Sequence, residues 1–492
     1  MGFDQKKPTF LSDKLLRSWI RCKRKAWLDS YGELNQRIWT AHHSLHLDHQ
    51  KKSFYALSFG KLSQGIEGCK AGEDFIVGMS LGMRLKEGQL IKVRPALLQK
   101  VAGQSIWGKY AYRPVLVRNG KRTTREIRQA LALSSILLEN LQKNPVPLGL
   151  SISQNNNYLD RQNIFISKEI KKQLMISLNR LNEDLSKKEP PPIASDRKKC
   201  VLCCWQRFCD SEAKHKGHLS EVSGIGKKRR ELLITLGINK IKDLAKRDIN
   251  ELTKKLNSLG EKDENLAYKL VSQARVQISN SPKRLGNQIS LPEVLSSEGI
   301  LIYDIESDPD EKKDFLHGFL IIKRKQNGDW DTENAKYDPL LMIYDDNEEH
   351  RWERIKRKIN HYSNWPILHY GETELITIMK IAKRQNMDPI QLSSLQSRFI
   401  DIHSRVKRNW LLPLNSYGLK SIANWTGFHW RQENADGARA LLWWRQWGKN
   451  SENRKRNYNL IKKIFDYNHD DCMATFAVAE WLIKQDRYNV RA

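Results

Sequence analysis

The chain has 492 residues, which is too long for a single hydrophobic core and predicts two to four domains. It carries 85 lysines and arginines against 56 aspartates and glutamates, a net charge of +29, and this charge favours nucleic acid over membrane as a partner. No apolar run approaches the roughly twenty residues of a membrane span, and the N-terminus lacks the apolar region of a signal peptide. We therefore expect a cytoplasmic protein, whose seven cysteines bind metal or remain free thiols.

The N-terminal part mixes helices and strands. Residues 11–31 predict an amphipathic helix capped by Ser12, which ends near Cys22 and runs into a second helix. Alternating apolar residues at 106–118 predict a strand. Further helices are predicted at 48–63, 124–142 and 170–185, and further strands at 75–81 and 89–93. A Glu-Pro-Pro-Pro segment at 189–192 then breaks the chain.

Four cysteines follow this proline-rich segment. Cys200, Cys203 and Cys209 have the close spacing of metal ligands, and basic neighbours favour the thiolate that binds an iron–sulfur cluster or zinc. A fourth ligand is needed, and either Cys22 or the adjacent Cys204 could supply it. The alternative is a buried apolar cysteine cluster without metal.

These features together resemble RecB-type nucleases of the PD-(D/E)xK superfamily. The resemblance rests on the segment 12–31, with Arg-Cys-Lys-Arg-Lys-Ala-Trp-Leu-Asp around Cys22, and on the later Cys-x2-Cys-x5-Cys. In AddB-like and CRISPR-adaptation relatives, one early and three late cysteines hold a [4Fe–4S] cluster that clamps the two ends of the nuclease domain. The resemblance therefore implies Cys22, Cys200, Cys203 and Cys209 as cluster ligands, with Zn²⁺ as the alternative.

The catalytic acids of that superfamily are missing from the corresponding region. The family cleaves with an Asp on one strand and a Glu or Asp, x, Lys on the next. Between residues 75 and 138, however, the only acids are Glu87 and Glu126, and the strand 112–118 has none. We expect residues 1–215 to keep the fold and the cysteine cluster, to have lost the nuclease chemistry, and to bind nucleic-acid phosphates.

A glycine pair in a basic context marks the middle of the chain. The glycines permit a tight hairpin, and the next helix begins with free N–H groups that can face a phosphate. With a second unit at 236–245, the pattern resembles the sequence-independent DNA-binding helix-hairpin-helix and predicts such a segment at 216–285, then a linker at 286–294. An ordinary helical turn is the alternative. The predicted nucleic-acid-binding residues are Gly224, Gly226, Lys227, Lys228 and Arg229.

The most informative stretch is Gly-Ile-Leu-Ile-Tyr-Asp-Ile-Glu-Ser-Asp-Pro at 299–309. Its apolar run predicts a buried strand, on which Asp304 and Glu306 point to the same side. Two adjacent carboxylates repel, and a pair of Mg²⁺ or Mn²⁺ ions would relieve the repulsion, as in two-metal nucleases. For an isolated Asp-x-Glu, the alternative is a strand that ends in a solvated acidic turn.

Later acids follow in a definite order. Glu374 lies where a strand passes into a helix, and Asp471 follows Tyr467 by one helical turn, so hydroxyl and carboxylate share a helix face. The set resembles DnaQ-like (DEDD) 3′–5′ exonucleases of ribonuclease-H-like fold, and more specifically the YprB-type domain fused to RecB-like nucleases. The resemblance implies Asp304, Glu306, Glu374 and Asp471 as metal ligands and Tyr467 as the water-orienting hydroxyl.

Several positions near these motifs are ambiguous. The family has Asp where this chain has Glu374, so Asp401 is the fallback ligand. Asp470 is interpreted as a helix-surface acid despite its neighbour. The tryptophans of Trp-Trp-Arg-Gln-Trp at 443–447 could stack on bases or pack in the core.

The expected fold class is multidomain α/β: a degenerate PD-(D/E)xK-like domain, a helical segment and a ribonuclease-H-like domain at 295–485. The expected function is a metal-dependent 3′–5′ exonuclease on DNA or RNA, with DNA preferred, two Mg²⁺ or Mn²⁺ ions and a [4Fe–4S] cluster. A helicase or repair protein is a possible partner. The alternative is a catalytically silent scaffold that binds nucleic acid in DNA repair or recombination.

Overall fold

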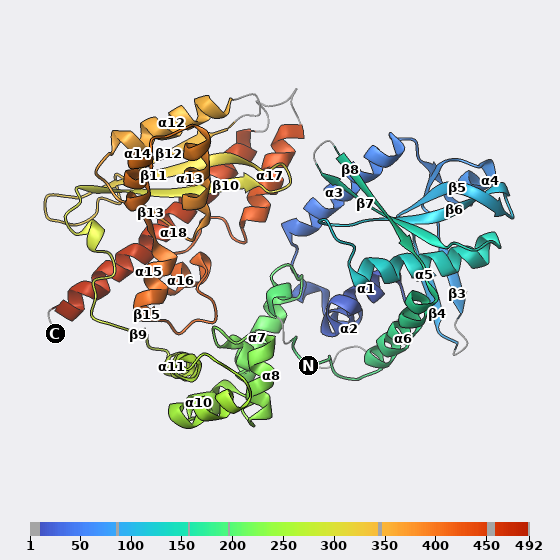
Figure 1. Cartoon of the computed structure of the whole chain (residues 1–492), viewed down its shortest axis with the longest axis horizontal. Coiled ribbons are helices and arrows are strands. Elements are labelled where there is room, and N and C mark those ends of the chain that lie inside the picture. Colours follow the sequence, from blue (N-terminus) through green and yellow to red (C-terminus); the bar gives the residue numbers. More distant parts are fainter. Residues whose placement is uncertain are drawn as a thin grey trace. The chain divides into compact units, whose positions relative to one another are not determined.

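Two units make up the chain, Met1–Ala213 and Lys214–Ala492 (Figure 1). The computed structural model describes residues 10–84, 88–155, 158–194, 197–342, 347–449 and 458–490. Within these ranges, no helix combines the length and the apolar character that crossing a bilayer requires.

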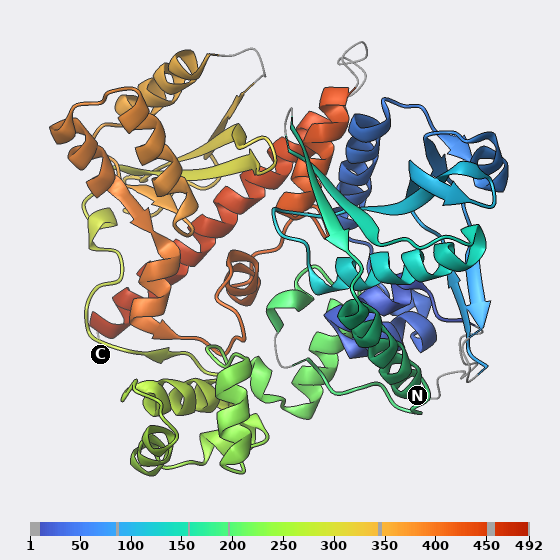
Figure 2. The ribbon, with the colours of Figure 1, turned by 45° about the vertical axis from the view of Figure 1, so that its right-hand side comes forward.

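The first unit is built on a mixed sheet with the strand order β1-β2-β5-β6-β7-β8. Alternate residues of β6 enter two separate cores: Tyr112 and Leu116 pack with helix α5, whereas Val115 and Val117 pack with helix α3. The central strand is therefore covered on both faces (Figure 2). The strands are β1 (Ser63–Gln64), β2 (Phe75–Val77), β3 (Leu81–Arg84), β4 (Leu90–Val93), β5 (Leu97–Ser105), β6 (Gly108–Val117), β7 (Leu148–Asn155) and β8 (Tyr158–Phe165).

The helices predicted for this unit are present, with changed bounds at 48–63, whereas those at Gly65–Ala71 and Gln206–Lys216 were not predicted. Ser12 caps α1 by accepting a 3.1 Å hydrogen bond from the backbone N–H of Leu15, and the helix ends at Cys22, as predicted. Helix α3 begins and ends earlier than predicted, because Phe59 takes a left-handed conformation (φ 50°) that terminates it. The β7–β8 hairpin was not predicted. The helices are α1 (Asp13–Arg21), α2 (Lys23–Tyr31), η1 (Leu34–Gln36), α3 (Ala41–Ser58), α4 (Gly65–Ala71), α5 (Arg125–Gln142), α6 (Lys168–Leu185), η2 (Arg197–Cys200) and α7 (Gln206–Lys216).

The second unit opens with short helices around their own apolar core, here called the helical module (residues 219–279). The segment after the helical module is attached to the rest of the unit, because β9 (Lys283–Arg284) pairs with β15 (Trp410–Leu411). Within the predicted linker 286–294, Leu291 and Val294 are buried in the core of the following domain. The helices of the module are η3 (Leu219–Glu221), α8 (Lys227–Thr235), α9 (Ile241–Ala245), α10 (Ile249–Ser258) and α11 (Leu266–Ser279).

A five-stranded sheet with the order β12-β11-β10-β13-β14 forms the rest of this unit. Strands β10 and β11 form an antiparallel hairpin, while β13 lies parallel to both β10 and β14. The strands are β10 (Gly299–Asp308), β11 (Lys313–Lys323), β12 (Lys336–Leu341), β13 (Ile367–His369) and β14 (Phe399–Asp401). The helices are η4 (Pro292–Val294), α12 (Glu348–His361), α13 (Thr373–Arg384), α14 (Pro389–Arg398), α15 (Ile402–Asn409), α16 (Leu419–Trp425), α17 (Gly437–Lys449) and α18 (Tyr458–Val490).

Helices cover both faces of this sheet, and strand β10 divides its side chains between them. Leu301 and Tyr303 enter the core with α12, α13 and α14. Ile300 and Ile302 enter the opposite core with α15, α16 and α18. The same alternation carries the acids at positions 304 and 306 to the α18 side.

Candidate metal centre

Three predicted acids come together where β10 meets α18. Asp304, Glu306 and Asp471 each offer one carboxylate oxygen, and these atoms lie within 4.8 Å of one another. Glu306 and Asp471 are buried, and Asp304 is partly exposed. Among the residues that the structure describes, this is the only such group of three or more His, Cys, Asp or Glu side chains. We call it the acidic cluster.

Asn468, one turn from the cluster on α18, was not predicted. Its amide nitrogen donates to Asp304 at 2.6 Å, and its amide oxygen accepts from the Tyr337 hydroxyl at 2.8 Å. A Cβ on Gly318 of β11 would lie 1.7 Å from that oxygen, so only glycine lets the side chain lie there. Because these contacts join β11, β12 and α18, no local motif could have revealed them.

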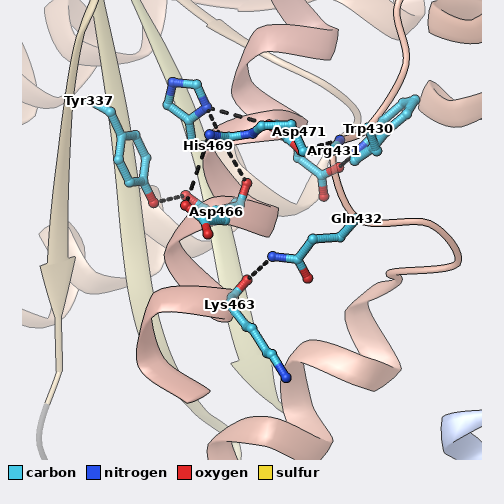
Figure 3. A network of polar contacts seen from close by, with 10 residues as sticks. Tyr337, Trp430, Arg431, Gln432, Lys463, Asp466, His469 and Asp471 are labelled. Carbon is cyan, nitrogen blue, oxygen red and sulfur yellow. Dashed lines mark hydrogen bonds and ion pairs between the residues drawn. The ribbon is translucent and has the colours of Figure 1, made fainter. Parts of the chain in front are cut away.

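Asp471 is oriented by two donors. The Tyr467 hydroxyl hydrogen-bonds to it, which confirms the predicted shared helix face. The Trp430 indole N–H donates a second bond at 2.7 Å, from a loop that the sequence left unassigned (Figure 3). Both donors stabilise the charged form of the carboxylate.

The electrostatics of the cluster fit a divalent cation. Burial, and then repulsion from neighbouring carboxylates, raise the pKa of Asp304 and of Glu306 well above the usual range. Burial also raises the pKa of Asp471, to about 6. The three acids therefore resist ionising together, and hard oxygen ligands of this kind are what Mg²⁺ and Mn²⁺ prefer.

Asp470 corrects the sequence interpretation. It is 3% exposed and not on the helix surface, because Arg431 covers it with a 2.7 Å side-chain bond and a 2.9 Å backbone bond. The same guanidinium reaches the Asp466 carbonyl and His469, as Figure 3 shows. Burial would raise the pKa of Asp470, but the hydrogen bond from His469 and the contacts with Arg431 outweigh burial and hold this pKa below its usual range. Asp470 thus fixes the loop that carries Trp430.

Glu374 and its fallback lie apart from the cluster. Glu374 is buried at the start of α13, 3.7 Å from the ring of His369, and one of its carboxylate oxygens has no hydrogen-bond partner. Its charge still raises the pKa of Asp304 and of Glu306. Asp401 instead caps α15, accepting from the backbone N–H groups of Gly371 and His403 at 2.9 Å each. Its oxygens are therefore engaged in the fold.

The four predicted cysteine ligands all lie in the first unit. Cys22 joins α1 to α2, and Cys203, Cys204 and Cys209 pack against Trp27 and Trp205. Burial raises the pKa of Cys209, and the nearby thiols of Cys200 and Cys22 raise it further. The thiol of Cys204 hydrogen-bonds to that of Cys203, which lowers the pKa of Cys204 to about 6. The iron–sulfur cluster, or the Zn²⁺ that is its alternative, stays a prediction.

The helical module contains the predicted glycine turn. Gly224 has φ 91°, which only glycine adopts without strain, and Gly226 precedes the start of α8. Lys227 and Lys228 are exposed at that helix start. Arg229 donates to the Gly224 carbonyl at 2.9 Å and so closes the turn. Nucleic-acid binding there stays a prediction.

Other acids and aromatic residues have structural partners. Glu126 forms a 2.9 Å ion pair with Arg21, and Glu87 lies outside the described residues. Trp444 and Trp447 are buried, with Trp444 stacked on Phe315 at 4.8 Å, so core packing and not base stacking describes them.

A comparison with known protein families found a match over the domain that contains the five-stranded sheet. Residues 301–483 match a family described as the RNase H superfamily. The match covers less than half of the chain but includes the whole acidic cluster. A search of curated proteins returned no match. The C-terminal region is therefore an RNase-H-like domain, which indicates a nuclease that acts on nucleic-acid phosphodiesters with Mg²⁺ or Mn²⁺.

Proposed function

We propose that the C-terminal domain is a metal-dependent 3′–5′ exonuclease on DNA or RNA, with DNA preferred. The acidic cluster, formed within an RNase-H-like domain, carries the proposal. Asp304, Glu306 and Asp471 would hold the cation, and Tyr467 would orient the attacking water from its position beside Asp471. A divalent cation bound there would activate the water and neutralise the charge that develops on the phosphate.

A second ion requires a further ligand, and Glu374 is the proposed one. Its unpartnered oxygen supports this role, because a buried carboxylate oxygen without a donor is costly unless a ligand satisfies it. Asp401 is the weaker candidate, because its oxygens already cap α15.

Digestion of 5′-labelled single-stranded DNA and RNA with Mg²⁺ or Mn²⁺ tests the proposal. Asp304→Ala should abolish a ladder that shortens from the 3′ end. Glu374→Gln should lower the rate, whereas Glu372→Gln, an exposed acid two residues away, should not. Undiminished cleavage by Asp304→Ala would contradict the site. Tight binding without hydrolysis by a folded wild type would instead favour a silent scaffold that works in repair with a partner such as a helicase.

The cysteines suggest a second metal centre, in the first unit. Cys22, Cys200, Cys203 and Cys209 are the proposed ligands of a [4Fe–4S] cluster or of Zn²⁺, supported by the electrostatic proximity of three of the thiols. Iron, zinc and sulfide content after anaerobic purification tests this proposal. Protein with none of the three would support the metal-free cysteine cluster.

A further inference from the structure

A pocket of about 260 Å³ opens beside the acidic cluster and has a lysine in its wall. It is lined by residues of the segment that begins α16 and by two residues of α18. The lining residues are Gly418, Leu419, Lys420, Ser421, Tyr467 and Asp471. The pocket thus contains the predicted water-orienting hydroxyl, one cluster carboxylate and one cation.

The ammonium of Lys420 is held by neutral groups. It donates to the Ala435 carbonyl and lies 5.4 Å from the ring centre of Trp430 and 5.5 Å from that of Tyr467. In the part of the chain that the structure describes, no carboxylate lies within 4.0 Å of this ammonium, although Asp471, Asp436 and Glu306 act on it through space. The positive charge of Lys420 is therefore not neutralised by a direct ion pair.

The segment that carries Lys420 is fixed by buried hydrogen bonds. Gln273 of α11 donates to the carbonyl oxygens of Leu412 at 2.8 Å and Leu414 at 3.3 Å. From the other side, the Tyr370 hydroxyl donates to the Tyr417 carbonyl at 2.5 Å. The chain enters α16 directly after these anchors, so the position of Lys420 is set by the fold.

We propose that Lys420 contacts the phosphate of the bound nucleotide, as a catalytic residue beyond the metal ligands. This inference rests on the proposed nuclease function. The cluster offers only carboxylates, which repel a phosphodiester, so an anion in this pocket needs a cation of its own besides metal. A positive charge there also stabilises the second negative charge that phosphate gains during cleavage. The opposing explanation is that Lys420 only balances the negative charge of the acidic cluster.

Binding of 2′-deoxyadenosine 5′-monophosphate and of 2′-deoxyadenosine, each with Mn²⁺, separates the two explanations. Fluorescence of Trp430, which the ammonium contacts, offers a signal, and calorimetry confirms it. The wild type should bind the monophosphate about tenfold or more tightly than the nucleoside, as a charge-assisted contact implies. Lys420→Met should remove this preference, and Lys420→Arg should keep part of it.

Lys463→Met is the matched control, because that lysine also lies over a tryptophan, 6.0 Å from the ring of Trp443, but does not line the pocket. It should leave the preference unchanged. Tighter Mn²⁺ binding by Lys420→Met, with monophosphate binding unaltered, would show charge balancing and overturn the inference. Failure of the wild type to prefer the monophosphate would overturn it as well.

The same variants distinguish this inference from the nuclease proposal. Cleavage that depends on Asp304 but not on Lys420, with an unchanged phosphate preference, would leave the nuclease and remove the role of Lys420. A preference that depends on Lys420, in a protein that never cleaves, would leave the phosphate contact and remove the nuclease.

Discussion

Asn468 of α18 connects three strands of the second sheet at the acidic cluster. Its amide donates to Asp304 and accepts from Tyr337, and it fits only because residue 318 is glycine. A neutral donor holds one oxygen of this proposed metal ligand without competing with the cation for the carboxylate, as a lysine ammonium would. Partners of this kind orient metal ligands and set their affinity.

Gly318→Ala should therefore weaken metal binding although it changes none of the proposed ligand side chains. The added Cβ would displace Asn468, and the loss of Mn²⁺ affinity should be on the order of tenfold, as for other partners of metal ligands. Asn468→Ala should have a similar effect, and the double variant should be no worse than Asn468→Ala alone, because both act through one amide. Calorimetric Mn²⁺ titration checks this. Additive losses would contradict it.

Metal binding should also depend on pH. Because a carboxylate must lose its proton to bind metal, and the pKa of Asp471 is about 6, Mn²⁺ affinity should fall as the pH drops through 6. The raised pKa of Asp304 and of Glu306 extends this dependence above pH 6. Titration from pH 5.5 to 8 checks it, and a flat profile would contradict it.

Without metal, the pH dependence of the free energy of unfolding has the opposite sign. The folded state keeps the Asp471 proton up to about pH 6, whereas the unfolded state loses it near the ordinary aspartate pKa of 3.8. The metal-free fold should therefore lose stability as the pH rises from about 4 to about 6, on the order of 3 kcal/mol from this group. Asp471→Asn should remove that part of the pH dependence in denaturant unfolding with EDTA.

At the scale of elements, the helical module and the RNase-H-like domain share hydrogen bonds within one unit. Gln273 is 3% exposed, and the Tyr417 hydroxyl donates to its amide oxygen at 3.2 Å. Asn415 donates to the buried carboxylate of Glu221 at 2.8 Å. The module therefore holds the loop at 412–417, which leads to the pocket.

Gln273→Ala should loosen this loop and leave the acidic cluster intact. It removes the side-chain donor to the Leu414 carbonyl and one of two donors to the buried Leu412 carbonyl, which also accepts from the Leu414 N–H. The loss should cost about 1–3 kcal/mol of unfolding free energy. KM should rise while Mn²⁺ affinity stays the same, since no cluster residue contacts Gln273. The exposed Gln391→Ala on α14 is the control. Weaker Mn²⁺ binding by Gln273→Ala would show that the loop also shapes the cluster.

Local periodicity explains which parts of the site could be predicted. The alternation along β10 placed Asp304 with Glu306, and the helical spacing placed Tyr467 with Asp471, because both are properties of one element. Trp430 and Lys420 come from chain between 412 and 435, whose position depends on tertiary contacts. Asp470 was misjudged for the same reason: no helical pattern shows that Arg431 covers that side of α18.

At the scale of the whole molecule, the proposed catalytic features lie in one unit, whereas the net positive charge is a property of the whole chain. The acidic cluster, the pocket and the helical module all lie in the second unit, whereas the net charge of +29 belongs to the whole chain. In the first unit, β6 carries no carboxylate, and its neighbour Arg118 is buried and pairs with Asp160 of β8. Binding rather than cleavage by that unit, like its PD-(D/E)xK resemblance, stays a prediction.

A fragment of residues 214–492 should bind Mn²⁺ as the full chain does. Its affinity for single-stranded DNA should be lower and less dependent on salt, because it lacks the phosphate contacts expected of the first unit. Fluorescence anisotropy at several salt concentrations checks this. A folded fragment with unchanged DNA affinity and salt dependence would contradict the binding role of the first unit.

The separation of the cluster ligands along the chain has a consequence for biosynthesis. Asp304 and Glu306 emerge from the ribosome long before Asp471, and α18 supplies both Asp471 and Asn468. Domains fold as units during synthesis, so the proposed metal centre would form only when this last long helix docks on the sheet. A chain that stalls before α18 would expose an apolar sheet face and two unpaired acids, and it would be inactive until synthesis is finished.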